Sequence, residues 1–275
     1  MSPPGTSLAP RPSNPLAAVD AIARHSRLLR VQGRCVIEPA CDGQAGGAGE
    51  HDLAALAALL PGFVFDTGHP CVMARSALQR GAVRIGTHRG FGGLAAAVSC
   101  HDLYECLAET RADQGAFVSY AALFPGTCFA GEAEFEDALW QHLQAMHEVD
   151  RRYFGWDPSV SPDPDAARFS FSVGGHAWYV IGMHPLASRL ARRAPAPLLV
   201  FNPHAQFEQL RAAGSYRPLR DRIRARDRAL QGSVNPMLAD HGSASEARQY
   251  SGRAVEPSWR CPFQPGRAAA AAPDR

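Results

Sequence analysis

Two apolar, β-prone runs near the middle of the 275-residue sequence each end close to a histidine that stands beside a proline. The first run covers residues 169–173 and 177–181 and leads to His184, and the second covers residues 198–201 and leads to His204. Phe, Val, Ile and Tyr dominate both runs, and Gly or Pro borders them, as is typical of buried strands. Side chains at strand ends are held by the sheet and face open space, so we expect the two histidines to mark a site.

Helical patterns alternate with strand-like runs along the rest of the sequence. The clearest helix is predicted over residues 132–153, where apolar residues recur at helical spacing and three glutamates fall in the first turn. We also expect helices at 52–60, ended by Pro61, at 94–109 and at 218–231, and strands at 82–85 and 117–124. This order predicts an α+β (mixed α/β) fold with a central sheet flanked by helices.

The chain ends differ in composition from its middle. Residues 1–17 are rich in Pro and Ser, and we expect them to be disordered, as we do residues 264–275. Residues 18–263 are predicted to form a single domain, in which the weakly periodic segment 235–263 wraps the core.

Composition excludes several kinds of chemistry. All 28 basic Lys and Arg residues are arginine, which rules out a pyridoxal phosphate Schiff base and the lysine of a phosphate-binding loop. The seven cysteines form no CxxC pair, so a structural zinc site is not expected. A net charge of +2 does not favour nucleic acid or an anionic membrane as partner. Without a secretory signal or an apolar run of roughly 20 residues, the chain is expected to be cytoplasmic.

Several side chains are candidates for a site, and each also has a structural interpretation. His184 and His204 are suited to binding iron or zinc, or to capping strand ends. Arginines near them, Arg189 above all, are suited to holding anionic groups, or form a solvated helix face. Cys71 and Cys261 each stand beside a proline and are either haem thiolate ligands or buried apolar cysteines.

Six motifs in order resemble those of the YqcI/YcgG family, whose characterised members include haem-dependent N-hydroxylases of guanidine groups. They are PCVMAR (70–75), HPLASR (184–189), LVFNPHAQFEQLR (199–211), NPML (235–238), SEARQYSGR (245–253) and WRCPF (259–263). The resemblance covers residues 63–263 and makes the predicted domain a catalytic, haem-binding one. It implies a monooxygenase that converts L-arginine to Nω-hydroxy-L-arginine in antibiotic biosynthesis of the D-cycloserine type.

The resemblance also implies a set of site residues around haem b. His184 is the expected iron ligand, with His204 second, and Arg189 and Arg211 are the expected partners of the haem propionates. Glu208 and Glu246 are the acids expected to bind the guanidinium group. The expected partners are L-arginine or a related guanidino compound, O2 and an external electron donor, because the sequence has no flavin or nicotinamide motif.

Two other functions stay open at this point. One is a non-catalytic haem-binding or sensor protein. The other is a non-haem iron oxygenase in which His184, His204 and a carboxylate such as Glu208 form a facial triad. The sequence leaves a homodimer open and does not fix the order of the strands.

Overall fold

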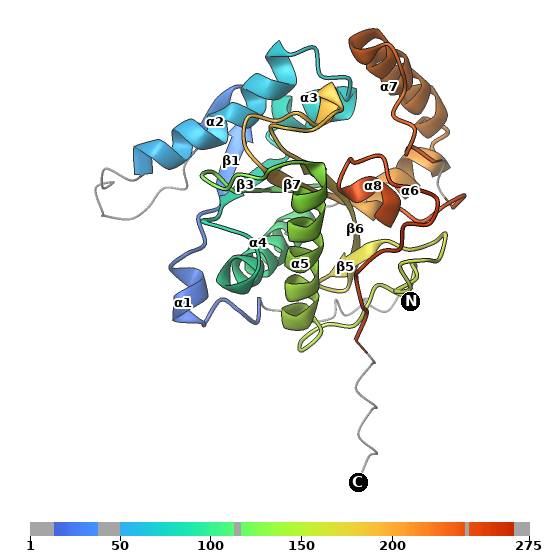
Figure 1. Ribbon diagram of the computed structural model, residues 1–275. Helices are drawn as coiled ribbons and strands as arrows, with labels where there is room; N and C mark the ends of the chain where they lie inside the picture. The colour runs from blue at the N-terminus through green and yellow to red at the C-terminus, as the bar shows by residue number, and fades with distance from the viewer. Residues whose placement is uncertain (1–13, 38–49, 113–116, 240–241, 267–275) are drawn as a thin grey trace, which may run out of the picture.

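The computed structural model describes residues 14–37, 50–112, 117–239 and 242–266 (Figure 1). In this part of the chain, the strands form one seven-stranded sheet of order β2-β1-β3-β4-β7-β6-β5. The strands are β1 (Leu29–Gln32), β2 (Cys35–Ile37), β3 (Val83–Thr87), β4 (Ser119–Leu123), β5 (Phe171–Val173), β6 (His176–Met183) and β7 (Leu198–Pro203). The β3–β4 pair is parallel and the other pairs are antiparallel. The sheet and its helices confirm the predicted single-domain α+β fold.

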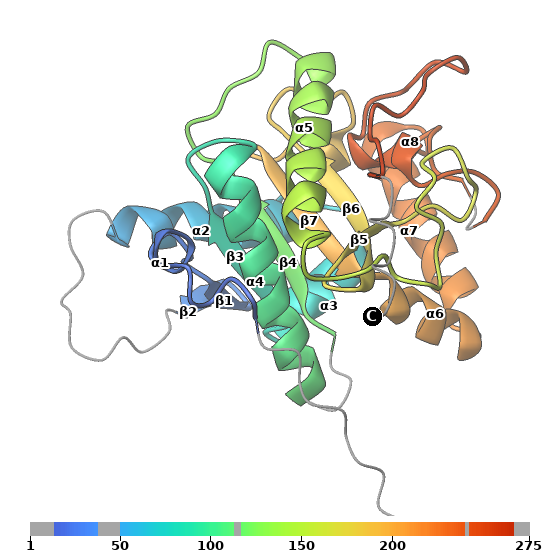
Figure 2. The same cartoon turned by 90° about the horizontal axis from the view of Figure 1, so that it is seen from below.

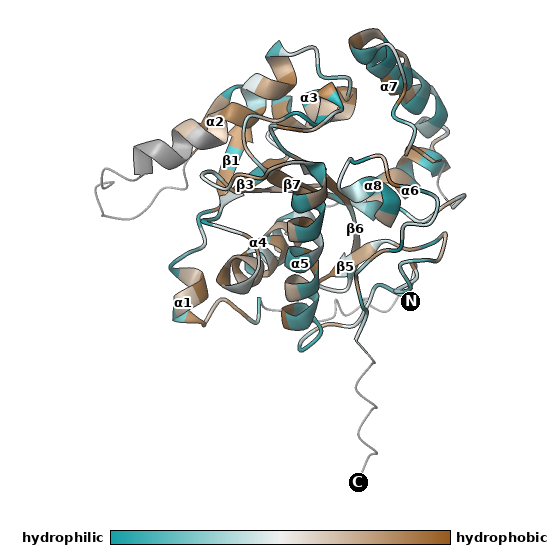
Figure 3. Ribbon diagram, viewed as in Figure 1, coloured by the Kyte–Doolittle hydropathy of each residue, from teal (hydrophilic) through white to brown (hydrophobic). Residues whose placement is uncertain are grey.

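Helices cover both faces of this sheet (Figures 1 and 2). The helices are α1 (Asp20–Ala23), α2 (Glu50–Asp66), α3 (Val72–Gln79), α4 (Gly93–Ala112), α5 (Glu132–Asp150), the 3-10 helix η1 (Leu190–Arg192), α6 (His204–Ala212), α7 (Tyr216–Gln231) and α8 (Ala247–Tyr250). One hydrophobic cluster joins α4 and α5 to the sheet, and a second joins α2 and α3 to the opposite face. The strands between the two clusters are mostly hydrophobic, whereas α7 is mostly hydrophilic (Figure 3).

Strand β4 shows how the two clusters share one sheet. All five of its residues are buried. Tyr120 and Ala122 belong to the cluster under α4 and α5, whereas Ala121 and Leu123 belong to the cluster under α2 and α3. Because side chains alternate between the faces of a strand, a strand buried on both sides reads as a continuous apolar run. The strand predicted at 117–124 is confirmed, because its continuous apolar run is the pattern of such a strand.

Helix α2 does not end where the sequence predicted. It continues through Pro61 to Asp66, although a helix stop was expected at Leu60. A proline inside a helix costs about 3 kcal/mol because it removes one hydrogen bond and its ring crowds the preceding turn. Phe63 and Val64 are buried in the cluster under α2, and burying two such side chains contributes about 1.5–3 kcal/mol each. Tertiary packing therefore offsets the local helix-breaking signal.

The ordered core extends slightly beyond the predicted domain limits. The Asn14 side chain donates to Glu105 Oε1 at 2.6 Å, and Leu16 is buried. At the other end, the Gln264 N–H donates to Gln144 Oε1 at 2.9 Å. The predicted disorder of residues 14–17 and 264–266 is therefore wrong, and the same prediction for residues 1–13 and 267–275 lies outside the described residues. None of the helices that the structure describes has the length and apolar character needed to cross a bilayer.

Candidate active site

The sheet does not bring the two predicted histidines together. Strands β6 and β7 are antiparallel, with Met183 paired to Leu198 and Trp178 paired to Pro203. His184 therefore leaves the sheet beside the start of β7, and His204 leaves it near the start of β6. Five residue steps separate these positions, which is about 16 Å along a strand. The expectation of one joint site at the two strand ends is wrong, because it required parallel strands.

His184 lies on the face of the sheet that α5 covers. Its ring is buried and stacks on Phe135 with 4.4 Å between ring centroids. Neither ring nitrogen has a hydrogen-bond partner among the described residues. Burial lowers the pKa of this imidazole, with a small opposing effect of Glu132. His184 does not line the cavity described below, and its role as an iron ligand stays a prediction.

The separation of the histidines also bears on the non-haem alternative. A facial triad needs His184, His204 and Glu208 around one metal ion, and the strand directions prevent this. In the described segments, no group of three or more His, Cys, Asp or Glu side chains is arranged to hold a metal ion. The antiparallel arrangement of β6 and β7 therefore argues against the triad.

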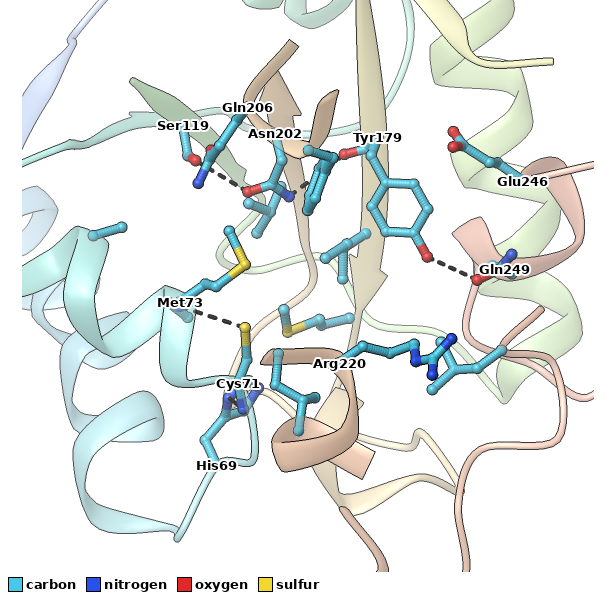
Figure 4. Close-up of a pocket in the computed structure, with 18 of the residues that line it drawn as sticks. His69, Cys71, Met73, Ser119, Tyr179, Asn202, Gln206, Arg220, Glu246 and Gln249 are labelled. Atoms are coloured by element: carbon cyan, nitrogen blue, oxygen red, sulfur yellow. Dashed lines mark hydrogen bonds between the residues drawn. The ribbon is translucent and has the colours of Figure 1, made fainter. Parts of the chain in front are cut away.

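A cavity of about 270 Å³ lies on the opposite face of the sheet, between α3, α6 and α7 (Figure 4). Most of its wall is apolar. The apolar lining includes Met73, Ala77, Leu78, Tyr179, Ile181, Met183, Val200, Phe207 and Ile223. A groove of about 890 Å³ adjoins it and shares Met73, Ala77, Ser119 and Gln206 with its lining. A mostly apolar cavity with a few polar groups is the usual form of a ligand site.

Cys71 lines this cavity at the N-terminus of α3. Its sulfur accepts a hydrogen bond from the Ala74 N–H at 3.4 Å and so caps the helix. Figure 4 shows the sulfur directed toward the cavity space. His69 holds the turn before it: Nδ1 accepts from the Cys71 N–H at 3.3 Å, and Nε2–H donates to the Ala191 carbonyl at 3.1 Å. Both ring nitrogens of His69 already make hydrogen bonds. The Cys71 sulfur is therefore the atom of this turn that is placed to bind a ligand or metal ion in the cavity.

The surroundings of Cys71 include groups that favour its thiolate form. Burial raises the pKa of the thiol, whereas the N–H groups of Ala74 and Met73 and the positive charge of Arg192 lower it. The Arg192 guanidinium is buried and donates to the Gly182 carbonyl at 2.8 Å. A thiol of this kind stays protonated alone and is deprotonated when a metal ion binds it.

Cys261, the other proline-flanked cysteine, is placed differently. It packs against the cluster under α4 and α5 and does not line the cavity. Burial raises the pKa of its thiol to about 12. The structural interpretation given for Cys261 therefore fits, whereas Cys71 both caps α3 and lines the cavity, so both of its interpretations stay open.

Polar groups gather on another side of the cavity, where Figure 4 shows Tyr179, Gln249 and Glu246. The Tyr179 hydroxyl donates to Gln249 Oε1 at 2.9 Å. Glu246 lines the cavity with a side chain only 10% exposed, and His204 Nε2 lies 3.4 Å from its Oε1. Glu208, the second predicted acid, lies on α6 with a 53% exposed side chain that pairs with Arg211. Only Glu246 of the two predicted acids thus lines the cavity.

The two predicted propionate partners also separate. Arg211 lines the cavity together with Arg220 and Arg224 of the neighbouring α7. Arg189 is buried elsewhere, where its guanidinium pairs with Asp227 at 2.7 Å and donates to Ser233 Oγ at 2.9 Å. Arg189 therefore ties η1 to α7 and does not line the cavity, and its expected role as a propionate partner stays a prediction.

Replacing Arg189 by methionine should lower the free energy of unfolding by about 3 kcal/mol, because it leaves the buried Asp227 carboxylate without its charge partner. Urea unfolding measures this change. The matched control is Arg34→Met, which breaks the exposed pair with Asp66 and should change stability little. Equal losses in both variants would contradict the structural role of Arg189.

Several lining residues were not among the predicted site residues. His69, Tyr179, Asn202 and Gln249 lie outside the predicted set, although all line the cavity. Tyr179 and Asn202 alternate with core-facing residues on β6 and β7, so a known strand direction would have placed them on this face. His69 directly precedes the motif PCVMAR (70–75) that contains Cys71.

The fold and cavity define a mixed α+β, single-domain protein with a largely apolar cavity that a thiol lines. A model of the YqcI/YcgG family matches residues 60–264, more than half of the chain. The chain therefore belongs to the YqcI/YcgG family. The matched segment contains every cavity-lining residue named above. No curated protein and no solved structure shows significant similarity to the chain.

Proposed function

We propose that this protein is a cytoplasmic, haem-dependent monooxygenase that N-hydroxylates a guanidine group, with L-arginine or a close relative as substrate. The observation that carries the proposal is the cavity itself. A sulfur at a helix N-terminus, Cys71, and a nearly buried carboxylate, Glu246, line one apolar space. An apolar wall suits a porphyrin, a thiolate suits its iron, and a carboxylate suits a guanidinium.

The donor set fits haem b. Cys71 would hold the iron, and Arg211, Arg220 and Arg224 would hold the propionates at the rim. Arg211 already pairs with Glu208 and Arg220 with Asp221, so propionates would compete with exposed surface pairs. Haem would supply the activated oxygen and the electron path that no side chain can provide.

The remaining chemistry belongs to the chain's own residues. The reaction converts a guanidine N–H, O2, two electrons and two protons into N–OH and water. Glu246 would orient the guanidinium by hydrogen bonds, and Tyr179 and Gln249 would complete its polar surroundings. The apolar wall would keep bulk water away from the reacting nitrogen. An external one-electron donor supplies the electrons.

Replacing Glu246 by glutamine should weaken binding of L-arginine about hundredfold while haem content stays unchanged, since a charged fork to the guanidinium is lost. Titrating the haem absorption spectrum with L-arginine measures the affinity. The matched control is Glu208→Gln, which changes a carboxylate on the other side of His204 that does not line the cavity. Equal affinity of both variants would remove Glu246 from the binding site.

Haem loading and product analysis test the proposed function as a whole. The purified, haem-loaded protein should form an N-hydroxylated guanidine when supplied with O2 and a reductant, as detected by mass spectrometry. If the haem spectrum does not change when guanidino compounds are added and no product forms, a non-catalytic haem-binding protein would be favoured instead. A folded protein that takes up no haem would overturn the proposal.

A further inference from the structure

Three side chains form a continuous series from solvent to the cavity. His204 is the first residue of α6 and is buried. Its Nδ1 lies 3.8 Å from Glu208 Oε1, and its Nε2 lies 3.4 Å from Glu246 Oε1. The Glu208 side chain is 53% exposed, whereas that of Glu246 is 10% exposed and lines the cavity. The imidazole thus stands between a carboxylate in water and a carboxylate in the site.

The fold fixes each member of this series. Pro203 ends β7 and pairs with Trp178 across the sheet, so the sheet determines where His204 begins the helix. Glu208 follows at the i+4 position, on the same face of α6. Glu246 comes from the segment just before α8, and a hydrogen bond of 3.5 Å links it to the Tyr250 hydroxyl. The order solvent, imidazole, cavity therefore depends on β7, α6 and the C-terminal segment together.

We propose that Glu208, His204 and Glu246 carry protons from solvent into the cavity. This inference rests on the proposed function, because each N-hydroxylation consumes two protons together with O2 and two electrons from a one-electron reductant. Glu208 takes a proton from water and gives it to Nδ1 of His204. Nε2 then gives a proton to Glu246, whose carboxyl group releases it to the oxygen that leaves as water.

An imidazole is suited to this position because it accepts a proton at one nitrogen and releases another from the opposite nitrogen. The contacts of 3.4 Å and 3.8 Å are at or beyond the outer limit of a hydrogen bond, and catalytic contacts of this kind commonly tighten when a substrate binds. Glu246 is the only carboxylate among the described lining residues of the cavity. Proton entry at this point therefore delivers protons beside the guanidinium.

The experiment compares haem-loaded His204→Ala and Glu208→Gln proteins with the unmodified protein under a chemical reductant. We expect His204→Ala to lower turnover about hundredfold, which is the low end for lost proton transfer, and added imidazole to restore part of it. Glu208→Gln should lower turnover about tenfold. In both variants the affinity for L-arginine should stay within about threefold of that of the unmodified protein. The fraction of consumed O2 that is recovered as hydroxylated product should fall, and the solvent deuterium isotope effect on turnover should change. A merely structural role would not give this pattern.

The matched control is Glu148→Gln. Like Glu208, Glu148 is a partly exposed glutamate paired with an arginine three residues later, but it lies on α5 away from the cavity. Turnover of this variant should stay within about twofold. If the unmodified protein hydroxylates its substrate and His204→Ala matches it in turnover and isotope effect, the relay is overturned but the proposed function is not. Unmodified, haem-loaded protein that hydroxylates nothing would overturn the proposed function.

A second readout needs no turnover. A guanidinium bound at Glu246 places a positive charge next to the imidazole 3.4 Å from that carboxylate, so protons exchanged with solvent on binding should pass through His204 and Glu208. Calorimetry of L-arginine binding in two buffers of different ionisation enthalpy counts these protons. We expect the count to fall to near zero in His204→Ala and to persist in Glu148→Gln. An unchanged count in His204→Ala would contradict the relay.

Discussion

Haem-loaded Cys71→Ser protein should lose the spectrum of a thiolate-ligated ferrous carbon monoxide complex and bind haem about hundredfold more weakly, a change of about 2.8 kcal/mol. The reason is geometric, because the Cys71 sulfur faces the cavity at the start of α3. Serine keeps a hydroxyl that still caps the helix, so the variant removes the soft ligand and preserves the fold. Absorption spectra and a haem titration measure both effects.

Two control variants separate Cys71 from the other candidate ligands. Cys261→Ala removes a thiol on the far face of the sheet and should leave the spectrum unchanged. His184→Ala removes the imidazole predicted from the sequence, whose ring stacks on Phe135 away from the cavity. If His184→Ala abolished haem binding while Cys71→Ser kept the thiolate-like spectrum, the ligand assignment proposed here would be wrong.

Elements with strong periodicity could be predicted from the sequence. Helix α5 presents an apolar stripe and begins with glutamates, and β4 and β7 are apolar on both faces, so local residues alone indicate their type. Strand direction is not encoded in this way. The 14-residue connection from His184 to Pro197 includes η1. Its length and helical turn are compatible both with a crossover between parallel strands and with a return between antiparallel strands. The wrong placement of His184 beside His204 follows from this one ambiguity.

The candidate site shows the same limit. The motif containing Cys71 could be noticed in the sequence, but its sulfur faces the cavity only because α3 packs against α2 and β1. Arg189 and Arg211 look equivalent in sequence, since both follow a histidine by a few residues. Tertiary contacts distinguish them, because Asp227 lies beside Arg189 and the cavity lies beside Arg211. Side-chain partners that come from distant segments cannot be read from local spacing.

Buried histidines make this fold sensitive to acid. Burial is the largest cause that lowers the pKa of His69 and His88 to about 4 and that of His142 to about 3. His88 and His142 lie on the α5 side of the sheet and are both hydrogen-bonded. His88 Nε2 lies 2.8 Å from the Tyr120 hydroxyl, and His142 Nδ1 accepts from the Gly92 N–H at 2.9 Å. A proton on any of these rings would be buried without adequate solvation.

Lowering the pH from 7 to 5 should therefore reduce the free energy of unfolding by about 4 kcal/mol. Below pH 6.5 the unfolded chain binds protons at His69, His88 and His142 while the folded chain does not, so each destabilises by about 2 kcal/mol at pH 5. Asp150 acts in the opposite direction, because burial raises its pKa to about 6 and the folded carboxyl binds a proton first, which offsets about 1–2 kcal/mol. Urea unfolding at a series of pH values measures the slope.

His142→Gln should flatten this dependence between pH 6.5 and 4, whereas the exposed-site variant His25→Gln should not, because His25 remains accessible to water in the fold. A stability that stays constant down to pH 5 would mean that these imidazoles are solvated or already charged in the native protein.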